Sequence, residues 1–287
     1  MYRSHFGLRE LPFTITPDTS FFFACASYQE ALNTLLAAVV SGEGFIKITG
    51  EVGTGKTLLC RKFLATLGAD SGDGRFVTAY IPNPYLEPRT LLLAVADELG
   101  IAPEKDIEQH QLLKAVNHRL IELVGEGKQV VLCLDEAQAM PLETLEALRL
   151  LTNLETEKRK LLQVVLFGQP ELNTKLQHNS VRQLRQRITF HYDLSALVLE
   201  ELEAYLSHRL MVAGYNGARL FGKGAVKRLH VASRGVPRLV NILAHKSLML
   251  AYGQGVHEVS ARHVSDAAAD TPSARKIGRW AGWMSAA

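Results

Sequence analysis

Cysteine is scarce in this sequence, and the few that are present lie far apart. Cys25, Cys60 and Cys133 are the three in 287 residues, and this odd, scattered set argues against a disulfide framework and against a zinc site. We expect reduced thiols packed inside the protein. The composition is 47% apolar, which is ample for a buried core, and the length suits one large domain or two unequal ones.

Long apolar runs are also missing. No stretch approaches the roughly 18 to 20 apolar residues that a membrane-spanning helix requires. The first residues, 1–5, do not begin a secretory signal. We therefore expect a cytoplasmic protein without a transmembrane segment.

An excess of charge is absent from residues 1–270, which carry 29 basic and 29 acidic residues. The net charge of +3 comes from residues 271–287, which hold three basic residues and no acid. Because acidic and basic residues are equal in number here, the overall charge does not indicate nucleic-acid binding, although a local basic patch is compatible with it.

The segment 271–287 combines its positive charge with aromatic residues. Its notable side chains are those of Arg275, Lys276, Ile277, Arg279, Trp280 and Trp283. A basic, Trp-containing tail of this kind can lie on an anionic membrane surface. A solvated terminus, or one that docks on a partner, is the alternative.

Strand-like and helix-like segments alternate through the first two thirds of the chain. We predict strands near 45–49, 75–81, 129–134, 161–168 and 188–193, and helices near 28–41, 56–67, 88–99, 107–125 and 141–153. This order predicts an α/β fold with a mainly parallel five-stranded sheet flanked by helices on both faces. Two of the strand segments are almost continuously apolar, as central strands must be.

The pattern changes after Asp193, where helical segments follow one another without a further strand. We predict helices near 199–213, 222–233, 237–252 and 260–269, separated by glycine-containing turns. The predicted domains are an α/β nucleotide-binding domain over 1–195, a small all-helical domain over 196–270 and the tail over 271–287.

The residues from Gly50 to Thr57 match the phosphate-binding pattern G-x-x-x-x-G-K-[ST] between a predicted strand and a predicted helix. Glycines let consecutive N–H groups surround a phosphate, Lys56 adds a positive charge, and the Thr57 hydroxyl can ligate Mg²⁺. The pattern predicts that ATP and Mg²⁺ bind here. The predicted nucleotide-binding residues are Gly50, Glu51, Val52, Gly53, Thr54, Gly55, Lys56, Thr57 and Leu58.

Two adjacent acids, Asp135 and Glu136, end the apolar run 129–134, as in a Walker B motif. Ligands of open α/β sheets bind at the carboxyl ends of strands. We expect Asp135 to hold the metal, directly or through water, and Glu136 to orient and polarise the attacking water. Gln138 could relay between the nucleotide and a neighbouring element, or it could be a local cap.

Hydrolysis also needs positive charge near the γ-phosphate, and arginine supplies it with planar, multi-donor geometry. Arg182, Arg185 and Arg187 compete for that role, and Arg187 directly precedes the fifth strand. Arg238 follows Gly235-Val236-Pro237 in the first turn of a helix, and this geometry could aim it at the phosphates from the helical domain. Each arginine could instead belong to an ordinary charged surface.

Gln169 is the first polar side chain after the fourth predicted strand, where it could sense the γ-phosphate. Together these segments resemble the AAA+ ATPases of the general secretion pathway protein A type, the ExeA-like group. The matching segments, in family order, are 48–51, 135–138, 168–172, 184–188 and 235–238. The resemblance implies a P-loop NTPase fold with a helical lid. Many AAA+ proteins have Asn, Ser or Thr where Gln169 stands.

The N-terminal stretch 2–23 also resembles this group, in which related proteins close such a segment over the adenine. Leu11, Pro12 and Phe13, within the predicted adenine-covering segment 1–27, are therefore candidate adenine contacts, with simple core packing as the alternative. The resemblance further implies a homo-oligomer, such as an ATP-dependent hexameric ring, in which Arg187 faces the next subunit's nucleotide.

The leading functional hypothesis is an ATP hydrolase that drives or regulates assembly of a pilus or secretion apparatus at the inner membrane. Secretion members of the group continue into a transmembrane helix and a peptidoglycan-binding domain. This sequence stops earlier, and so resembles the MshM-type ATPases of mannose-sensitive haemagglutinin (MSHA) pilus biogenesis. The alternatives are a DNA-binding regulator of transposition, similar to TniB and TnsC, and a nucleotide-gated binding module with little turnover.

Overall fold

The computed structural model describes residues 2–70, 74–102, 107–152 and 160–276. By their internal contacts the residues form two compact units. One unit, residues 26–195, is called the sheet unit here. The other, residues up to 25 together with those from 196 onwards, is called the helical unit.

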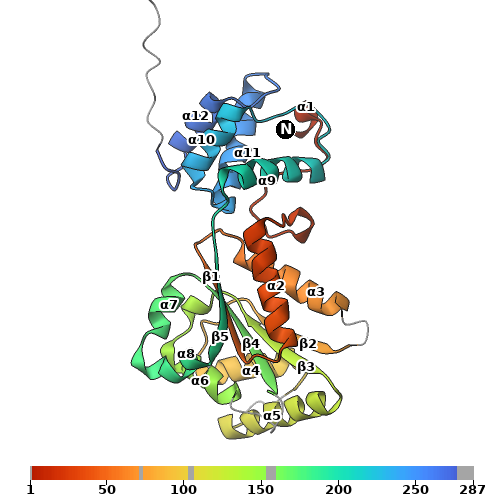
Figure 1. Ribbon diagram of the computed structural model, residues 1–287, viewed down its shortest axis with the longest axis vertical. Coiled ribbons are helices and arrows are strands. Elements are labelled where there is room, and N and C mark those ends of the chain that lie inside the picture. Colours follow the sequence, from red (N-terminus) through yellow and green to blue (C-terminus); the bar gives the residue numbers. More distant parts are fainter. Residues whose placement is uncertain (1, 71–73, 103–106, 153–159, 277–287) are drawn as a thin grey trace, which may run out of the picture. The chain divides into compact units, whose positions relative to one another are not determined.

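The sheet unit is built on five parallel strands in the order β2-β3-β4-β1-β5 (Figure 1). The strands are β1 (Phe45–Gly50), β2 (Phe76–Ile81), β3 (Gln129–Leu134), β4 (Leu162–Gly168) and β5 (Ile188–Leu194). Strands β3 and β4, whose sequences are nearly all apolar, are buried and lie inside the sheet. The predicted fold class and all five strand positions are confirmed.

Helices cover both faces of this sheet, because alternate side chains of each strand point to opposite faces. Helix α2 (Ala26–Val40) packs against β5 and β1, and α3 (Lys56–Asp70) packs against β1, β4 and β2. Helices α4 (Pro88–Glu98), α5 (Gln109–Gly125) and α6 (Leu142–Thr152) pack against β2, β3 and β4 respectively. Alternate residues such as Leu132, Val164 and Leu166 join these last three helices in one buried apolar cluster. The core therefore holds the carboxyl ends of β1, β3 and β4 in fixed register.

The helical unit contains α1 (Tyr2–Phe6), α9 (Leu199–Val212), α10 (Lys223–Ser233), α11 (Pro237–Gly253) and α12 (Ala261–Ala269). The last three pack closely on one another. The predicted helices near 199–213, 222–233, 237–252 and 260–269 match α9 to α12 within one residue at each end.

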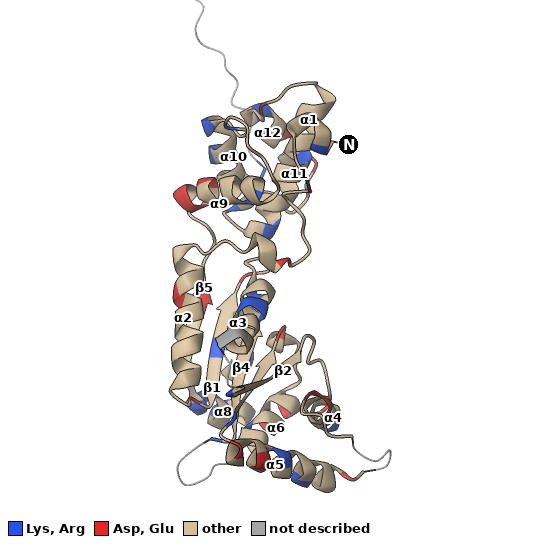
Figure 2. Cartoon of the chain, turned by 90° about the vertical axis from the view of Figure 1, so that its right-hand side faces the viewer, with Lys and Arg blue, Asp and Glu red and all other residues tan. Residues whose placement is uncertain are grey.

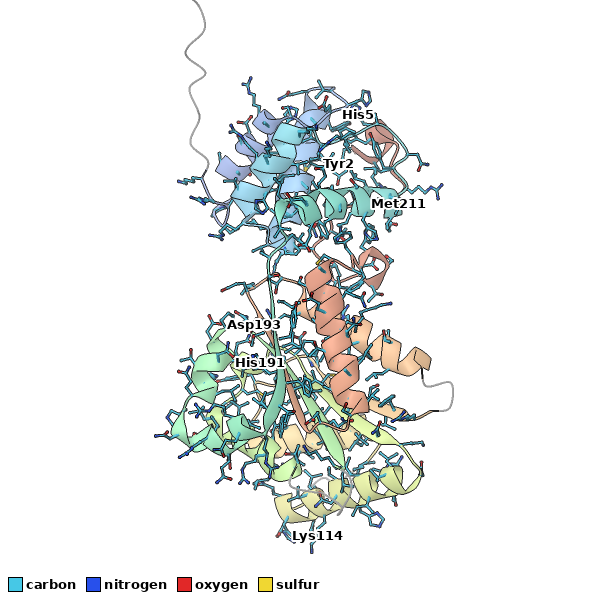
Figure 3. The ribbon with its side chains drawn as sticks, viewed as in Figure 1. Tyr2, His5, Lys114, His191, Asp193 and Met211 are labelled. Carbon is cyan, nitrogen blue, oxygen red and sulfur yellow. The ribbon has the colours of Figure 1, made fainter. Side chains whose placement is uncertain are left out.

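Residues 1–25, which we predicted to be part of the first domain, share the helical unit instead. Helix α1 packs on α11, where the Tyr2 hydroxyl bonds His245 Nδ1 at 2.9 Å. The ring of His5, a residue labelled in Figure 3, stacks on His257 with ring centroids 4.1 Å apart. Burial raises the pKa of Tyr2 to about 12. These aromatic contacts explain why the N-terminus joins the helices rather than the sheet.

All three cysteines are buried and none is part of a disulfide, as predicted. Among the residues that the structure describes, no helix combines the length and apolar character needed to cross a membrane. The predicted membrane contacts Ile277, Arg279, Trp280 and Trp283 lie outside the described residues.

Candidate functional site

The glycine-rich loop connects β1 to α3 at the carboxyl edge of the sheet. Gly53 and Gly55 adopt φ values of 83° and 95°, which side-chain-bearing residues rarely adopt. A Cβ atom on Gly55 would stand 2.2 Å from the Tyr28 hydroxyl of α2. The loop conformation therefore depends on glycine for backbone freedom and for space.

Lys56 is the first residue of α3 and is buried. Its Nζ donates to the carbonyl oxygens of Gly50 at 2.7 Å and Glu51 at 3.0 Å, so the ammonium group lies against the loop. Burial lowers the pKa of Lys56, and the nearby carboxylates, chiefly Glu136 and Asp135, act in the opposite direction. The loop thus carries a buried cation at the start of a helix, where the helix dipole also favours an anion.

The next residue links this loop to the end of β3. The Thr57 hydroxyl donates to Asp135 Oδ2 at 2.6 Å, and Asp135 is only 2% exposed. Burial raises the pKa of Asp135, while the bond from Thr57 and the N–H of Glu136 lower it. A hydroxyl and a carboxylate in contact beside a phosphate loop are the oxygen ligands that Mg²⁺ takes alongside phosphate oxygens.

Glu136 stands next to this pair in a strained backbone conformation, with φ 56°. Two amide side chains hold its carboxylate. Gln138 Nε2 donates to Glu136 Oε2 at 2.5 Å, and Gln169 Nε2 donates to the same oxygen at 3.1 Å. The backbone N–H of Gln169 donates to Gln138 Oε1 at 2.9 Å. The three residues form a closed ring of hydrogen bonds that joins the end of β3 to the end of β4.

Gln138 is thus more than a local cap, because it bonds both Glu136 and the residue after β4. The sequence did not reveal this ring, because Gln169 is 31 residues from Gln138 and 33 residues from Glu136 along the chain. Tyr28 was also missed, because nothing in its local sequence signals contact with the loop. A third feature is the hydroxyl of Thr49, on β1, which donates to Asp193 of β5, a residue labelled in Figure 3.

The arginines predicted to act on a neighbouring nucleotide lie on α8 (Arg182–Arg187), a short helix that the sequence pattern does not predict. Arg182 and Arg185 are exposed, and Arg187 Nη1 donates to Thr152 Oγ1 at 3.4 Å. Leu184 anchors the helix in the core. Two of the three guanidinium groups are therefore free to face solvent.

Arg238 and the candidate adenine contacts belong to the helical unit, so the sheet unit alone does not bring them to the phosphate loop. Arg238 is in the first turn of α11 and is exposed. Phe13 is buried and meets Phe221 edge-on with ring centroids 5.8 Å apart, whereas Leu11 is 39% exposed. Pro12 accepts a hydrogen bond from Arg209 through its carbonyl oxygen. The roles of these residues toward a nucleotide stay predictions.

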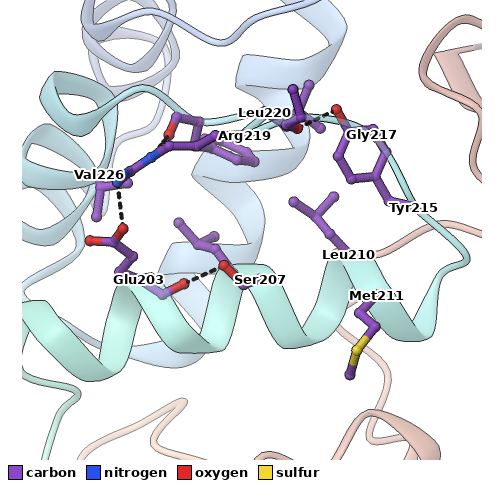
Figure 4. A pocket seen from close by; sticks show the side chains of 12 residues that line it. Glu203, Ser207, Leu210, Met211, Tyr215, Gly217, Arg219, Leu220 and Val226 are labelled. Carbon is purple, nitrogen blue, oxygen red and sulfur yellow. Dashed lines mark hydrogen bonds and ion pairs between the residues drawn. The ribbon is translucent and has the colours of Figure 1, made fainter.

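The helical unit also contains a cavity of about 240 Å³ between α9, α10 and the segment that joins them (Figure 4). Leu210, Leu220 and Val226 line it, and an ion pair of 2.6 Å between Arg219 and Glu203 lies at its side. None of the residues predicted to contact the nucleotide lines this cavity.

The donor set of the sheet unit fits a magnesium nucleotide. Positive-φ glycines open the loop, a buried ammonium group lies against it, and a hydroxyl–carboxylate pair adjoins it. A fold of five parallel strands in this order with such a loop defines a P-loop protein of the AAA type. In agreement, the family model described as an AAA domain matches residues 39–176.

The chain is 40% identical over 280 residues to general secretion pathway protein A of Aeromonas hydrophila, in a match that covers 98% of this chain. The chain spans about half the length of that relative, since the match covers 50% of it. Over nearly its whole length the chain is therefore similar to an ExeA-like AAA+ protein, as the resemblance predicted. The similarity does not separate the MshM type from the rest of the group.

Solved structures of distant proteins share the fold. Cdc6p of Pyrobaculum aerophilum is 18% identical, with a TM-score of 0.66 over 89% of this chain and 71% of that one. The ORC2 protein of Aeropyrum pernix is 19% identical, with a TM-score of 0.63 over 85% and 66%. The RuvB branch migration motor of Thermotoga maritima is 16% identical, with a TM-score of 0.58 over 90% and 72%. At these identities the likeness concerns the fold alone.

Proposed function

We propose that this chain binds ATP with Mg²⁺ and hydrolyses it to drive or regulate assembly of a type IV (MSHA-like) pilus or a type II secretion apparatus. One observation carries the proposal. Lys56, the Thr57–Asp135 pair and Glu136 meet at one edge of the sheet, beside a loop shaped by glycines.

The binding half of this proposal assigns each group by its chemistry. The loop N–H groups from Gly50 to Leu58 and the Lys56 ammonium group bind the phosphates, while Thr57 and Asp135 hold the metal. Bound Mg²⁺ neutralises phosphate charge and supplies an electrophilic centre. The hydrogen bond between Thr57 and Asp135 holds these two side chains together without a bound nucleotide or metal.

The catalytic half assigns Glu136 as the group that orients and polarises the attacking water. Both amides donate to Oε2 of its carboxylate, so Oε1 is the oxygen that can accept a hydrogen bond from water. Gln169, which follows β4, is proposed to sense the γ-phosphate. Arg187 and Arg238 are proposed to stabilise the charge that develops on the γ-phosphate, from a neighbouring subunit and from the helical unit respectively.

The proposed biological setting rests on the similarity to general secretion pathway protein A, together with the similarity of the sequence motifs. We propose a homo-oligomer that works in the cytoplasm, peripherally at the inner membrane, with pilus or secretion assembly proteins as partners. The test is a strain that carries Lys56→Ala in place of the natural residue, with surface pili and secreted proteins measured. We expect one of the two to fall to the level of the deletion strain. Normal amounts of both would contradict the proposed process.

A further inference from the structure

The helical unit contains a long stretch of sequence without an acidic residue. Between Glu203 and Glu258 there is no Asp or Glu, whereas eight Lys and Arg residues occur. This local excess of positive charge does not appear in the net charge of residues 1–270, which is zero.

Helix α10 carries several of them on its solvent side. Its buried residues, including Val226 and Leu229, pack into the helical unit. Lys227 is exposed on the opposite side, Lys223 lies one turn before it at the start of the helix, and Val231 lies one turn further along with 45% of its surface exposed. The solvent side of α10 is therefore a basic stripe with an apolar side chain in line.

The residues that follow α12 extend this surface. The Arg275 N–H donates to the Ala232 carbonyl oxygen at 2.9 Å, and Arg234 Nη2 donates to the Ser273 carbonyl oxygen at 3.5 Å. These bonds hold Arg275 and Lys276, both exposed, at the carboxyl end of α10. We call the resulting surface the α10 basic face. Its members are Lys223, Lys227, Arg228, Arg234, Arg275 and Lys276.

Little negative charge opposes this face. Glu258 lies beside Gly222 at the start of α10, and Asp266 lies 3.9 Å from Arg262 on α12. Within the described part of the chain, Lys223, Lys227 and Lys276 form no ion pair. Figure 2 shows basic segments along α10, whereas the acidic segment near it belongs to the start of α9.

We propose that the α10 basic face binds an anionic lipid bilayer surface. Lysine and arginine near such a surface each gain attraction from acidic headgroups, and an apolar side chain among them suits the interface. The sequence just beyond Lys276 continues with Arg279, Trp280 and Trp283, and tryptophan is enriched at membrane interfaces. The face would thus hold the helical unit against the bilayer.

Duplex nucleic acid is the competing anionic partner, and the surface fits it less well. Proteins that bind the phosphates of the DNA backbone combine Lys and Arg with Ser, Thr, Asn or Gln donors. On α10 the exposed side offers none of these, because its single such residue, Ser233, is buried and bonds the Leu229 carbonyl oxygen. The inference is independent of ATP hydrolysis, since the face contains no residue of the nucleotide site.

The experiment measures co-sedimentation of the full chain with vesicles of phosphatidylcholine alone or with about 30% phosphatidylglycerol, at about 0.1 M salt. The test variant is Lys223→Gln/Lys227→Gln. The control is Lys114→Gln/Lys128→Gln, which removes the same charge from the sheet unit (Lys114 is labelled in Figure 3). ATP binding and thermal unfolding confirm that both variants are folded.

We expect binding to the anionic vesicles alone and an approximately 30-fold weaker affinity for the test variant, from about fivefold per lysine. The control variant should bind within about twofold of the wild type. Equal binding of wild type and test variant would overturn the proposal, even if the tail itself binds lipid. The proposal would also be overturned, in favour of nucleic acid, if the wild type failed to bind vesicles and the test variant lost affinity for duplex DNA.

Discussion

Gln138 is the residue on which the geometry of Glu136 depends most directly. It donates to Glu136 and accepts from the N–H of Gln169, so its orientation is fixed at both ends. We predict that Gln138→Ala lowers kcat for ATP hydrolysis by roughly tenfold, the value of one good hydrogen bond, with KM nearly unchanged. Steady-state phosphate release measures this, and the control is Gln111→Ala, which changes an exposed side chain of α5.

A merely structural Gln138 would give a different result, because the variant would then lose stability or ATP affinity rather than turnover. Thermal unfolding and binding of a fluorescent ATP analogue separate these cases. An unchanged kcat in Gln138→Ala would remove this residue from the proposed mechanism. Gln138→Glu is a second variant, which should be poorly active because it places a carboxylate against the carboxylate of Glu136.

Gly55 gives a second test at the scale of single residues. Its φ of 95°, together with the Tyr28 hydroxyl 2.2 Å from where an added Cβ would lie, leaves no room for alanine. We predict that Gly55→Ala weakens ATP binding by about 100-fold, because the loop must shift to relieve the overlap. Tyr28→Phe in addition should restore part of the affinity. Gly68→Ala, where no atom lies within 4 Å, is the control, and equal affinities would contradict the account.

The residues of the phosphate loop and the acids after β3 could be predicted because each group is contiguous in the sequence and has a fixed spacing. The ring of Glu136, Gln138 and Gln169 could not, because it forms only when β3 and β4 lie side by side. The same holds for Tyr28, whose contact with Gly55 depends on the packing of α2. Sequence patterns therefore find the groups, while the fold decides how they are held.

At the scale of elements, the long helices were predictable because a period of about 3.6 persists over several turns, and the central strands because short apolar runs are typical of buried strands. Helices α1, α7 (Glu171–Leu176) and α8 were not predicted. Each has only five or six residues, too few for a period to be recognised. Tertiary packing, such as that of Leu184 and Leu172 into the core, stabilises these short helices instead.

The turn into α11 is an element whose geometry depends on one glycine. Gly235 has φ 72°, and an added Cβ would lie 2.1 Å from the Leu197 carbonyl oxygen. Because that neighbour is backbone, we predict that Gly235→Ala destabilises the helical unit by roughly 3 kcal/mol. Chemical denaturation measures the change. Gly253→Ala, with open space and a helical position, should be neutral or slightly stabilising; similar losses in both variants would argue against this explanation.

At the scale of the whole molecule, the predicted boundary near residue 195 coincides with the division between the two units, but the predicted place of residues 1–25 does not. The sequence alone could not assign this segment, because contacts such as that between Tyr2 and His245 link positions far apart in the chain. The proposed adenine contacts therefore lie on the same unit as Arg238.

A ring-forming ATPase completes each site with an arginine from the next subunit. We predict that Arg187→Ala and Lys56→Ala are each inactive alone, and that a mixture recovers activity, because the Lys56→Ala subunit supplies Arg187 to its neighbour. At equal amounts the recovered rate should approach about a quarter of the wild type for random neighbours. Phosphate release from mixtures measures this. If Arg182→Ala or Arg185→Ala is the variant that recovers activity with Lys56→Ala instead, that arginine has the role. If no arginine variant recovers activity in such a mixture, active sites are not shared between subunits.

The central claim is that Glu136 activates water for hydrolysis of ATP bound at the glycine-rich loop. The most direct test compares ATP binding and Mg²⁺-dependent phosphate release in the wild type and in Glu136→Gln, with chelation of Mg²⁺ as the blank. We predict that the variant binds ATP as the wild type does and releases phosphate at least about 100-fold more slowly. Phosphate release by Glu136→Gln at the rate of the wild type would contradict the claim.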